Sequence, residues 1–331
     1  MILKRVVNIS KDYLQRLKLK VTGFFGCFLL AQRGLPKSVI IMVDGGFASV
    51  LLKYVMGLWF EKKWGWQVKY DLGWFEKCSM DMDGVYSRKF QFKTVFPGVQ
   101  FEEASPEEIT VYKRWFRYKN RVLFKYSGED FLTPRPLYLD GYYANWRYLS
   151  FVREDFMQKL NFGVLELDSL NRLKVDTIRK KKVSVALHIR RGDFVNLGLC
   201  FITIDYYLAA IEYIRERVQD HELSMFIFSN GFDWVKTELL PRLKDDYDLV
   251  DINDNDSGYY DLYLMSQCHH QIISNSWLGF FAAYLNTHID GMIVVPDRIS
   301  NKDSVSEDAY GMPGWIRLSG ETGQYVGIHG E

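Results

Sequence analysis

The stretch VSVALHI (183–189), followed at once by RRGDF (190–194), decides the fold of the second half of the chain. Seven mostly apolar residues before a charged segment predict a strand buried in a parallel sheet. Helical patterns alternate with further strand-like runs downstream, which are SMFIFS (224–229), YDLVDI (247–252), QIISNS (271–276) and MIVVP (292–296). This repeated strand–helix unit predicts a parallel, doubly wound sheet, so we interpret residues 171–331 as one Rossmann-like domain.

The first half of the chain carries a similar but less regular pattern. SVIIMV (38–43) predicts a buried strand that ends in Asp44-Gly45-Gly46, and residues 48–65 have apolar side chains at helical spacing. The two glycines allow a sharp turn and a close approach of the backbone to a ligand. We therefore expect a second α/β domain over residues 39–170. The predicted fold class is α/β, with two Rossmann-like domains of parallel, doubly wound sheets facing a cleft.

Residues 1–38 form a basic N-terminal extension. They hold eight lysines and arginines against one acid, Asp12, for a net charge of +7. Their uncharged run VTGFFGCFLLAQ (21–32) is too short to cross a bilayer as a helix, which takes about 20 residues. Two interpretations of this amphipathic segment remain open: a helix at an anionic membrane surface, and a helix packed on the protein's own domain.

Composition excludes several classes of protein. With 48% hydrophobic and 25% charged residues the chain is an ordinary globular protein, and a net charge of +1 argues against nucleic-acid binding. The four cysteines are scattered, without a C-x-x-C pair. That pattern fits reduced thiols in the cytoplasm better than a disulfide framework or a zinc site.

The segment that carries chemistry is HIRRGD (188–193). Ligands of an open parallel sheet bind beyond the carboxyl ends of its strands, and the strand at 183–189 delivers these residues to that edge. Arg190 and Arg191 have planar, permanently charged side chains that can grip a diphosphate. Paired arginines are common on solvated surfaces, but their place directly after a buried strand, beside His188 and Asp193, favours an anion site.

These residues and their surroundings resemble the α-1,2-fucosyltransferases, which share an H-x-R-R-x-D motif with α-1,6- and protein O-fucosyltransferases. The resemblance covers nearly the whole second half, in residues 187–198, 226–236 and 259–286. In the first half it is limited to three blocks, which are DGGFASVLLKYVMG (44–57), WFE (74–76) with DGVYSRKFQF (83–92), and LYLDGYYANWRYL (137–149). The resemblance implies a GT-B type fold, with an acceptor-binding domain over 39–170 and a GDP-fucose-binding domain over 171–331.

The resemblance also implies a function. A galactoside 2-α-L-fucosyltransferase moves L-fucose from GDP-β-L-fucose to the 2-hydroxyl of a β-galactoside, with inversion at the anomeric carbon. Arg190 would bind the β-phosphate with Arg191 in support, while His188 and Asp261 would recognise guanine. Further contacts to the donor are implied for Asn275, Ser276, Gly45 and Gly46.

Structural roles remain as alternatives for three of these residues. Asn275 and Ser276 could cap the helix that follows them. Asp261 could be a first-turn acid that the helix dipole favours.

The catalytic base and the metal requirement are separate questions. Asp193 is the candidate base by position, although two neighbouring arginines would make it a weak one, and Asp44 and Asp140 are fallback candidates. The triplets Asp81-Met82-Asp83 and Asp254-Asn255-Asp256 match the D-x-D pattern of metal-dependent transferases, but we interpret them as solvated loop acids. With arginines available for the diphosphate, we expect no metal and no other cofactor.

The chain departs from the family pattern at two places. FASVLLK (47–53) replaces the usual L-G-N-Q-[ML]-F-Q after the paired glycines, and Gly279-Phe280-Phe281 replaces S-W-W. Two alternative functions remain open: a fucosyltransferase of other linkage, such as α-1,6, and a catalytically silent protein that binds GDP or a glycan. The expected partners are GDP-fucose and a galactose-containing glycan. The expected setting is the cytoplasmic face of a bacterial inner membrane, where surface polysaccharide is built.

Overall fold

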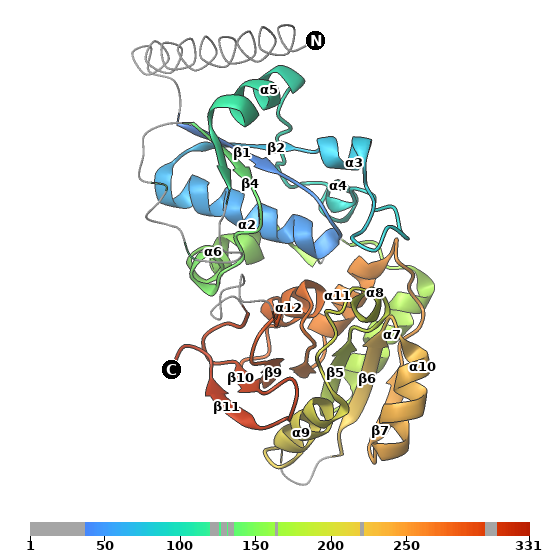
Figure 1. The fold of residues 1–331 in the computed structure, drawn as a ribbon. Helices are drawn as coiled ribbons and strands as arrows, with labels where there is room; N and C mark the ends of the chain where they lie inside the picture. The colour runs from blue at the N-terminus through green and yellow to red at the C-terminus, as the bar shows by residue number, and fades with distance from the viewer. Residues whose placement is uncertain are drawn as a thin grey trace, which may run out of the picture.

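The computed structural model describes residues 37–119, 126, 131, 136–162, 165–218, 222–301 and 310–331. They form two α/β domains, drawn one above the other in Figure 1, each with a mainly parallel sheet at its centre. The fold class expected from the sequence is confirmed. The predicted N-terminal extension lies outside the described residues up to position 36. No helix in the described ranges is both long enough and apolar enough to cross a membrane.

The first domain is built on a four-stranded parallel sheet in the order β2-β1-β4-β3. Its strands are β1 (Ser38–Met42), β2 (Gln67–Asp71), β3 (Arg117–Lys119) and β4 (Leu137–Asp140). Its helices are α2 (Phe47–Trp64), α3 (Gly73–Lys77), α4 (Phe92–Val95), α5 (Pro106–Trp115) and α6 (Trp146–Lys159). Helix α2 carries apolar residues on all sides, and it is almost wholly buried because it lies between the sheet and the second domain (Figure 1).

The second domain holds a seven-stranded sheet in the order β11-β10-β9-β8-β5-β6-β7, which is parallel except for the β10–β11 pair. Its strands are β5 (Ser184–Ile189), β6 (Ser224–Ser229), β7 (Asp246–Leu249), β8 (His270–Ile272), β9 (Ile293–Pro296), β10 (Ile316–Leu318) and β11 (Tyr325–Ile328). Its helices are α7 (Ser169–Lys180), α8 (Gly192–Asn196), α9 (Ile204–Arg215), α10 (Phe232–Trp234), η3 (Val235–Leu239), η4 (Leu240–Arg242), α11 (Gly258–Ser266) and α12 (Trp277–Tyr284). Apolar clusters cover both faces of this sheet.

Local sequence sets where several helices begin and end. Ser105 and Glu108 form a capping box around Pro106 at the start of α5. The side chain of Asn145 accepts a hydrogen bond from the first turn of α6, and that of Asp168 does the same for α7. Gly65 closes α2 in the left-handed conformation, at φ +62°.

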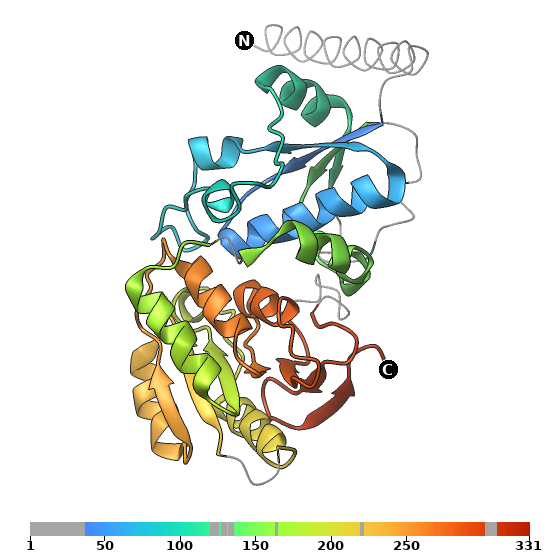
Figure 2. The same ribbon diagram turned by 180° about the vertical axis from the view of Figure 1, so that it is seen from behind.

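One hydrophobic core continues from the first domain into the second. Phe156 of α6 stacks on Phe281 of α12, with ring centres 5.7 Å apart, and meets Tyr284 edge-on at 5.3 Å. The hydroxyl of Tyr284 also donates a hydrogen bond to the carbonyl of Leu149 at 2.8 Å. Figure 2 shows α6 lying directly over α12. The relative position of the two domains is therefore fixed by apolar packing.

The shared core yields a prediction for stability. Phe156→Ala should lower the free energy of unfolding by about 3–5 kcal/mol, because it leaves a cavity where the two domains meet. Phe151→Ala removes the same side chain from the same helix at a position that is 39% exposed, and should cost about 1 kcal/mol or less. Urea denaturation followed by tryptophan fluorescence measures both. Equal losses for the two variants would contradict the shared core.

Candidate active site

A cleft of about 830 Å³ separates the two domains at the carboxyl ends of their parallel strands. Its first-domain wall comes from the turn after β1 and from the loop between α3 and α4. Its second-domain wall comes from the ends of β5, β6 and β7 and from the start of α12. The cleft has the size of a small-molecule site. The cleft is lined by these residues, to which the sequence gave a donor-binding or catalytic role: Asp44, Gly45, Gly46, His188, Arg190, Asp193, Asp261, Asn275 and Ser276.

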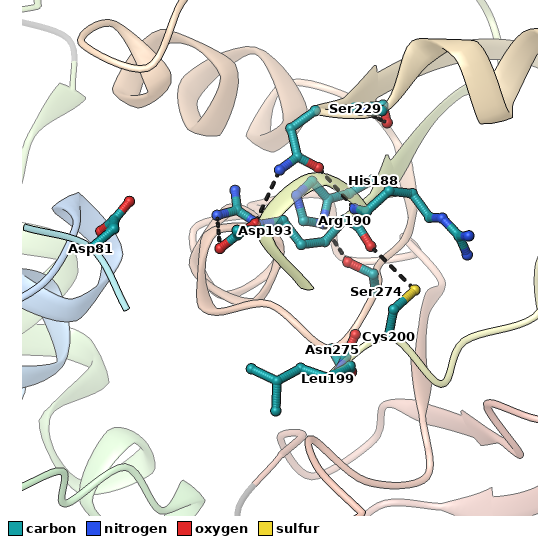
Figure 3. A network of polar contacts seen from close by, with 12 residues as sticks. Asp81, His188, Arg190, Asp193, Leu199, Cys200, Ser229, Ser274 and Asn275 are labelled. Carbon is teal, nitrogen blue, oxygen red and sulfur yellow. Dashed lines mark hydrogen bonds and ion pairs between the residues drawn. The ribbon is translucent and has the colours of Figure 1, made fainter. Parts of the chain in front are cut away.

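Arg190 is the first residue after β5, and its guanidinium lines the cleft (Figure 3). Nη2 donates a hydrogen bond to Oδ2 of Asp193 at 2.9 Å, and Nε lies 2.9 Å from Oδ1 without hydrogen-bond alignment. Asn230, directly after β6, donates from Nδ2 to Oδ1 of Asp193 at 3.2 Å. The arginine side chain keeps 20% of its surface exposed. A permanently charged group held in this way is preorganised to receive an anion.

Arg191 does not line the cleft. Its guanidinium lies 4.6 Å from the centre of the Trp234 ring, and its backbone N–H donates to Oδ1 of Asn230 at 2.8 Å. The backbone is tightly packed here, since a Cβ at Gly192 would stand 2.6 Å from Nδ2 of Asn230. The two arginines that the sequence placed in one anion site therefore make different contacts. Arg190 faces the cleft, whereas Arg191 holds the turn after β5 against α10.

His188 contributes a buried ring to the second-domain wall and is 4% exposed. Its Nδ1 lies 3.0 Å from the hydroxyl oxygen of Ser274. Burial, together with the nearby charge of Arg190, lowers the pKa of His188 to about 3, so the ring is neutral at physiological pH. An added Cβ at Gly279 would stand 2.6 Å from Nδ1. Glycine at this departure from the family pattern thus lets α12 approach the histidine.

Asn275 and Ser276 lie at the start of α12. Nδ2 of Asn275 donates to the carbonyls of Leu199 and Ile299, at 3.1 and 3.2 Å, and its buried Oδ1 has no hydrogen-bond partner among the residues that the structure describes. Ser276 occupies the N-cap position, but its side chain makes no capping hydrogen bond. The hydroxyl of Tyr310 accepts from the backbone N–H of Ser276 at 3.1 Å. The capping alternative considered for these two side chains is therefore not seen.

Asp261 lies in the first turn of α11 and is partly buried. Burial raises its pKa to about 6, a hydrogen bond from Asn253 acts in the opposite direction, and the charge of Asp251 adds to the increase. Nδ2 of Asn253 donates to Oδ1 of Asp261 at 2.8 Å. The first-turn position that we considered as a structural alternative is seen, yet the carboxyl also lines the cleft.

The turn after β1 forms part of the first-domain wall. Gly45 has a φ of +78°, and a Cβ there would stand 2.8 Å from the hydroxyl oxygen of Ser49, so this position requires glycine. Gly46 has an ordinary φ of −78°, and a Cβ there would make only a normal van der Waals contact with Arg88, at 3.7 Å. Asp44 also lines the cleft and forms an ion pair with Lys53, Nζ to Oδ1 3.2 Å.

One aspartate of each D-x-D triplet lines the cleft and forms an ion pair, Asp81 in the first and Asp256 in the second. For these two residues our interpretation as solvated loop acids was wrong. Nε of Arg88 donates to both carboxylate oxygens of Asp81, at 2.9 and 2.8 Å. Asp256, from the other domain, accepts from the hydroxyl of Tyr86 and pairs with Lys89, Nζ to Oδ2 2.7 Å. In the part of the chain that the structure describes, no group of three or more His, Cys, Asp or Glu is arranged to hold a metal ion.

Arg88 and Asn230 are two cleft residues to which the sequence analysis gave no role. Arg88 is a second guanidinium in the cleft, on the first-domain wall, where it pairs with Asp81. It lies in the block 83–92 that already resembled the family, so a basic residue there was the available signal. Asn230 follows β6, and the position after a parallel strand was the corresponding signal.

Comparison with known proteins shows which family the chain resembles. The sequence profile of Glycosyl transferase family 11 matches residues 112–319, more than half of the chain. Alpha-1,2-colitosyltransferase of Escherichia coli is 24% identical over 304 residues, which cover 85% of this chain and 98% of that protein. Galactoside alpha-(1,2)-fucosyltransferase 1 of Leontocebus fuscicollis is 25% identical over 213 residues, 59% of this chain and 54% of that protein.

Among solved structures, NodZ alpha-1,6-fucosyltransferase co-crystallized with GDP aligns at 15% identity with a TM-score of 0.42, over 75% of this chain and 92% of that one. The profile match and the two relatives confirm the resemblance found in the sequence. The chain belongs to glycosyl transferase family 11.

Proposed function

We propose that the protein is a galactoside 2-α-L-fucosyltransferase, which moves L-fucose from GDP-β-L-fucose to the 2-hydroxyl of a β-galactoside with inversion at the anomeric carbon. The observation that carries the proposal is the guanidinium of Arg190, which stands at the end of β5 in a cleft between two domains. Family membership supports glycosyl transfer, and the names of two relatives support the α-1,2 linkage.

The donor would bind along the second-domain wall. Its diphosphate would lie between Arg190 and the start of α12, where the hydroxyl of Ser276 and the backbone N–H groups of the first turn can face phosphate. Guanine would lie toward Asp261, whose carboxylate can accept hydrogen bonds from the N1–H and N2–H₂ groups of the base. His188 offers a neutral ring on the same wall. The backbone of Gly45 would close on the donor from the opposite side.

Transfer breaks the bond between C1 of fucose and an oxygen of the β-phosphate. Negative charge builds up on that phosphate in the transition state, and Arg190 would stabilise this charge inside the cleft. Asp193 and Asn230 hold the guanidinium in place, so that little reorganisation is needed during the reaction. We propose that this arginine takes the part that a metal ion plays in other transferases, and that no cofactor is required.

Colitose is a second candidate for the transferred sugar. The relative that aligns over 98% of its own length is named a colitosyltransferase. The galactoside acceptor rests on the name of the fucosyltransferase relative, of which the alignment covers 54%. Donor and acceptor therefore both need to be varied in the test.

An assay of GDP release and product formation tests the proposal. The purified protein is incubated with GDP-fucose or GDP-colitose and a panel of β-galactosides, with EDTA or with added Mg²⁺ or Mn²⁺. We expect galactoside-dependent release of GDP from GDP-fucose at a rate that EDTA does not change, and an α-1,2 linkage in the product by NMR. No turnover with either donor would refute the enzyme. Loss of turnover in EDTA would refute the metal-free mechanism.

The two arginines after β5 should differ sharply in mutagenesis. Arg190→Ala should lower kcat by about 10²–10³-fold, because it removes the charge that stabilises the departing diphosphate. Arg191→Ala should have a much smaller effect, since that side chain lies on Trp234 and does not line the cleft. Steady-state kinetics of both variants measures the difference. An Arg190→Ala protein as active as Arg191→Ala would remove Arg190 from the proposed role.

The affinity for GDP should depend on pH through Asp261. Guanine binds the ionised carboxylate, and the pKa of Asp261 in the free protein is raised to about 6, so protonation below that pH competes with the ligand. The Kd for GDP should therefore rise as pH falls through 6, approaching about tenfold per pH unit. Isothermal titration calorimetry between pH 5 and 8 measures this dependence.

Asp261→Asn is the matched control for this titration, because it cannot ionise. It should bind GDP more weakly at pH 7.5 and should keep only the pH dependence that comes from the terminal phosphate of GDP, which titrates near about pH 6. Identical pH profiles for the wild type and the variant would exclude Asp261 from guanine recognition.

A further inference from the structure

Most aspartates that line the cleft are engaged by other groups. Asp193 is held by Arg190 and Asn230, and both carboxylate oxygens of Asp81 accept from Arg88. The others, apart from Asp44, belong to the loop after β7 and to α11 of the second domain, on the wall where the nucleotide is proposed to bind. With the donor on the second-domain wall as proposed, the acceptor sugar would lie against the first domain, where the described aspartates that line the cleft are Asp81 and Asp44. Both oxygens of Asp81 are taken up by Arg88, which makes Asp44 the candidate.

Asp44 stands two residues beyond β1, next to the glycine turn, with 19% of its side chain exposed. Its Oδ1 is buried beside the ammonium of Lys53, at 3.2 Å. The remaining exposed surface of the side chain faces the cleft, since Asp44 is one of its lining residues. The carboxylate is therefore held by the ammonium of Lys53 and by a hydrogen bond from the hydroxyl of Tyr142, and its exposed surface meets ligand space.

Lys53 provides this anchor from inside α2, where its side chain is 1% exposed. Its Nζ also donates to the carbonyl of Gly141, directly after β4, and lies 4.1 Å from the centre of the Tyr142 ring. Burial lowers the pKa of Lys53, and the charge of Asp44 acts against this decrease. A buried ammonium is costly unless it is paired, so Lys53 and Asp44 constrain each other's position. Lys53 stands within the segment 47–53, which departs from the family pattern.

We infer that Asp44 is the group that accepts the proton of the acceptor hydroxyl, and that Lys53 is the residue that positions it. The inference rests on the proposed function. The acceptor oxygen forms a bond to C1 of the sugar while the bond from C1 to the β-phosphate oxygen breaks. The electron pair of the broken bond stays on the phosphate oxygen and leaves with GDP. The hydroxyl proton passes to the Asp44 carboxylate and is released to water once the product departs. No oxidant, reductant or further reactant is needed.

Asp44→Asn tests the proton acceptor. The change keeps the size of the side chain, so GDP affinity should match that of the wild type, while kcat for transfer to a galactoside should fall about 10²–10⁴-fold. Azide is an anion and needs no base, so the same variant should form glycosyl azide from GDP-fucose as fast as the wild type. Asp44→Ser serves as a second variant in case the asparagine protein does not fold.

Asp140→Asn is the matched control. It removes another carboxylate whose charge acts on Lys53, but one that pairs with Arg117 and does not line the cleft. We expect its transfer rate to stay close to that of the wild type. Lys53→Met should lower the galactoside rate while sparing the azide reaction, a split that general loss of structure would not produce.

Two results would overturn the inference. One is an Asp44→Asn protein that keeps more than about a tenth of the wild-type kcat. The other is a variant in which transfer and the azide reaction fall together, because Asp44 would then act on the donor. Failure of the proposed function looks different, since the wild type itself would then release no GDP from a sugar nucleotide when a galactoside is added.

Discussion

The position of one permanently charged guanidinium constrains much of the second domain. Arg190 follows a strand whose six residues are all buried, between two parallel neighbours, so the backbone that carries it has little freedom to move. The groups around Arg190 are compatible with its positive charge. Asp193 and Asn230 hold it from one side, Gly192 leaves room for that asparagine, and His188 stays neutral next to it. An anion that enters the cleft therefore meets a charge already in place.

Two kinds of contact join the domains around the cleft. Apolar packing of Phe156 on Phe281 belongs to a core that runs through both domains. Polar contacts form where Tyr86 and Lys89 of the first domain meet Asp256 of the second. The apolar contact fixes the domains rigidly, whereas ion pairs at the surface are weak and exchange readily with water. Small changes in the width of the cleft would thus occur where Tyr86 and Lys89 meet Asp256.

Sequence patterns were sufficient for the fold and for the strand end that borders the cleft. Alternating strand and helix patterns gave the parallel sheet, and the rule that ligands bind beyond strand ends pointed to His188 and Arg190. The rest depends on contacts between segments far apart in the chain. Nothing near Arg191 in the sequence predicts its contact with Trp234, which is 43 positions away. Likewise, a Cβ at Gly279 would meet the ring of His188, 91 positions away, at 2.6 Å, a contact that the local sequence does not predict.

The continuous core bears on how this protein could be recombined with its relatives. Helix α6 precedes the second domain in sequence, yet its Phe156 and Leu149 contact Tyr284 of α12, and Arg153 donates to the carbonyl of the same tyrosine. A chimera joined at the interdomain connection would pair one parent's α6 with another parent's α12 and mismatch this packing. A chimera that keeps this packing would therefore have to take α6 and α12 from the same parent.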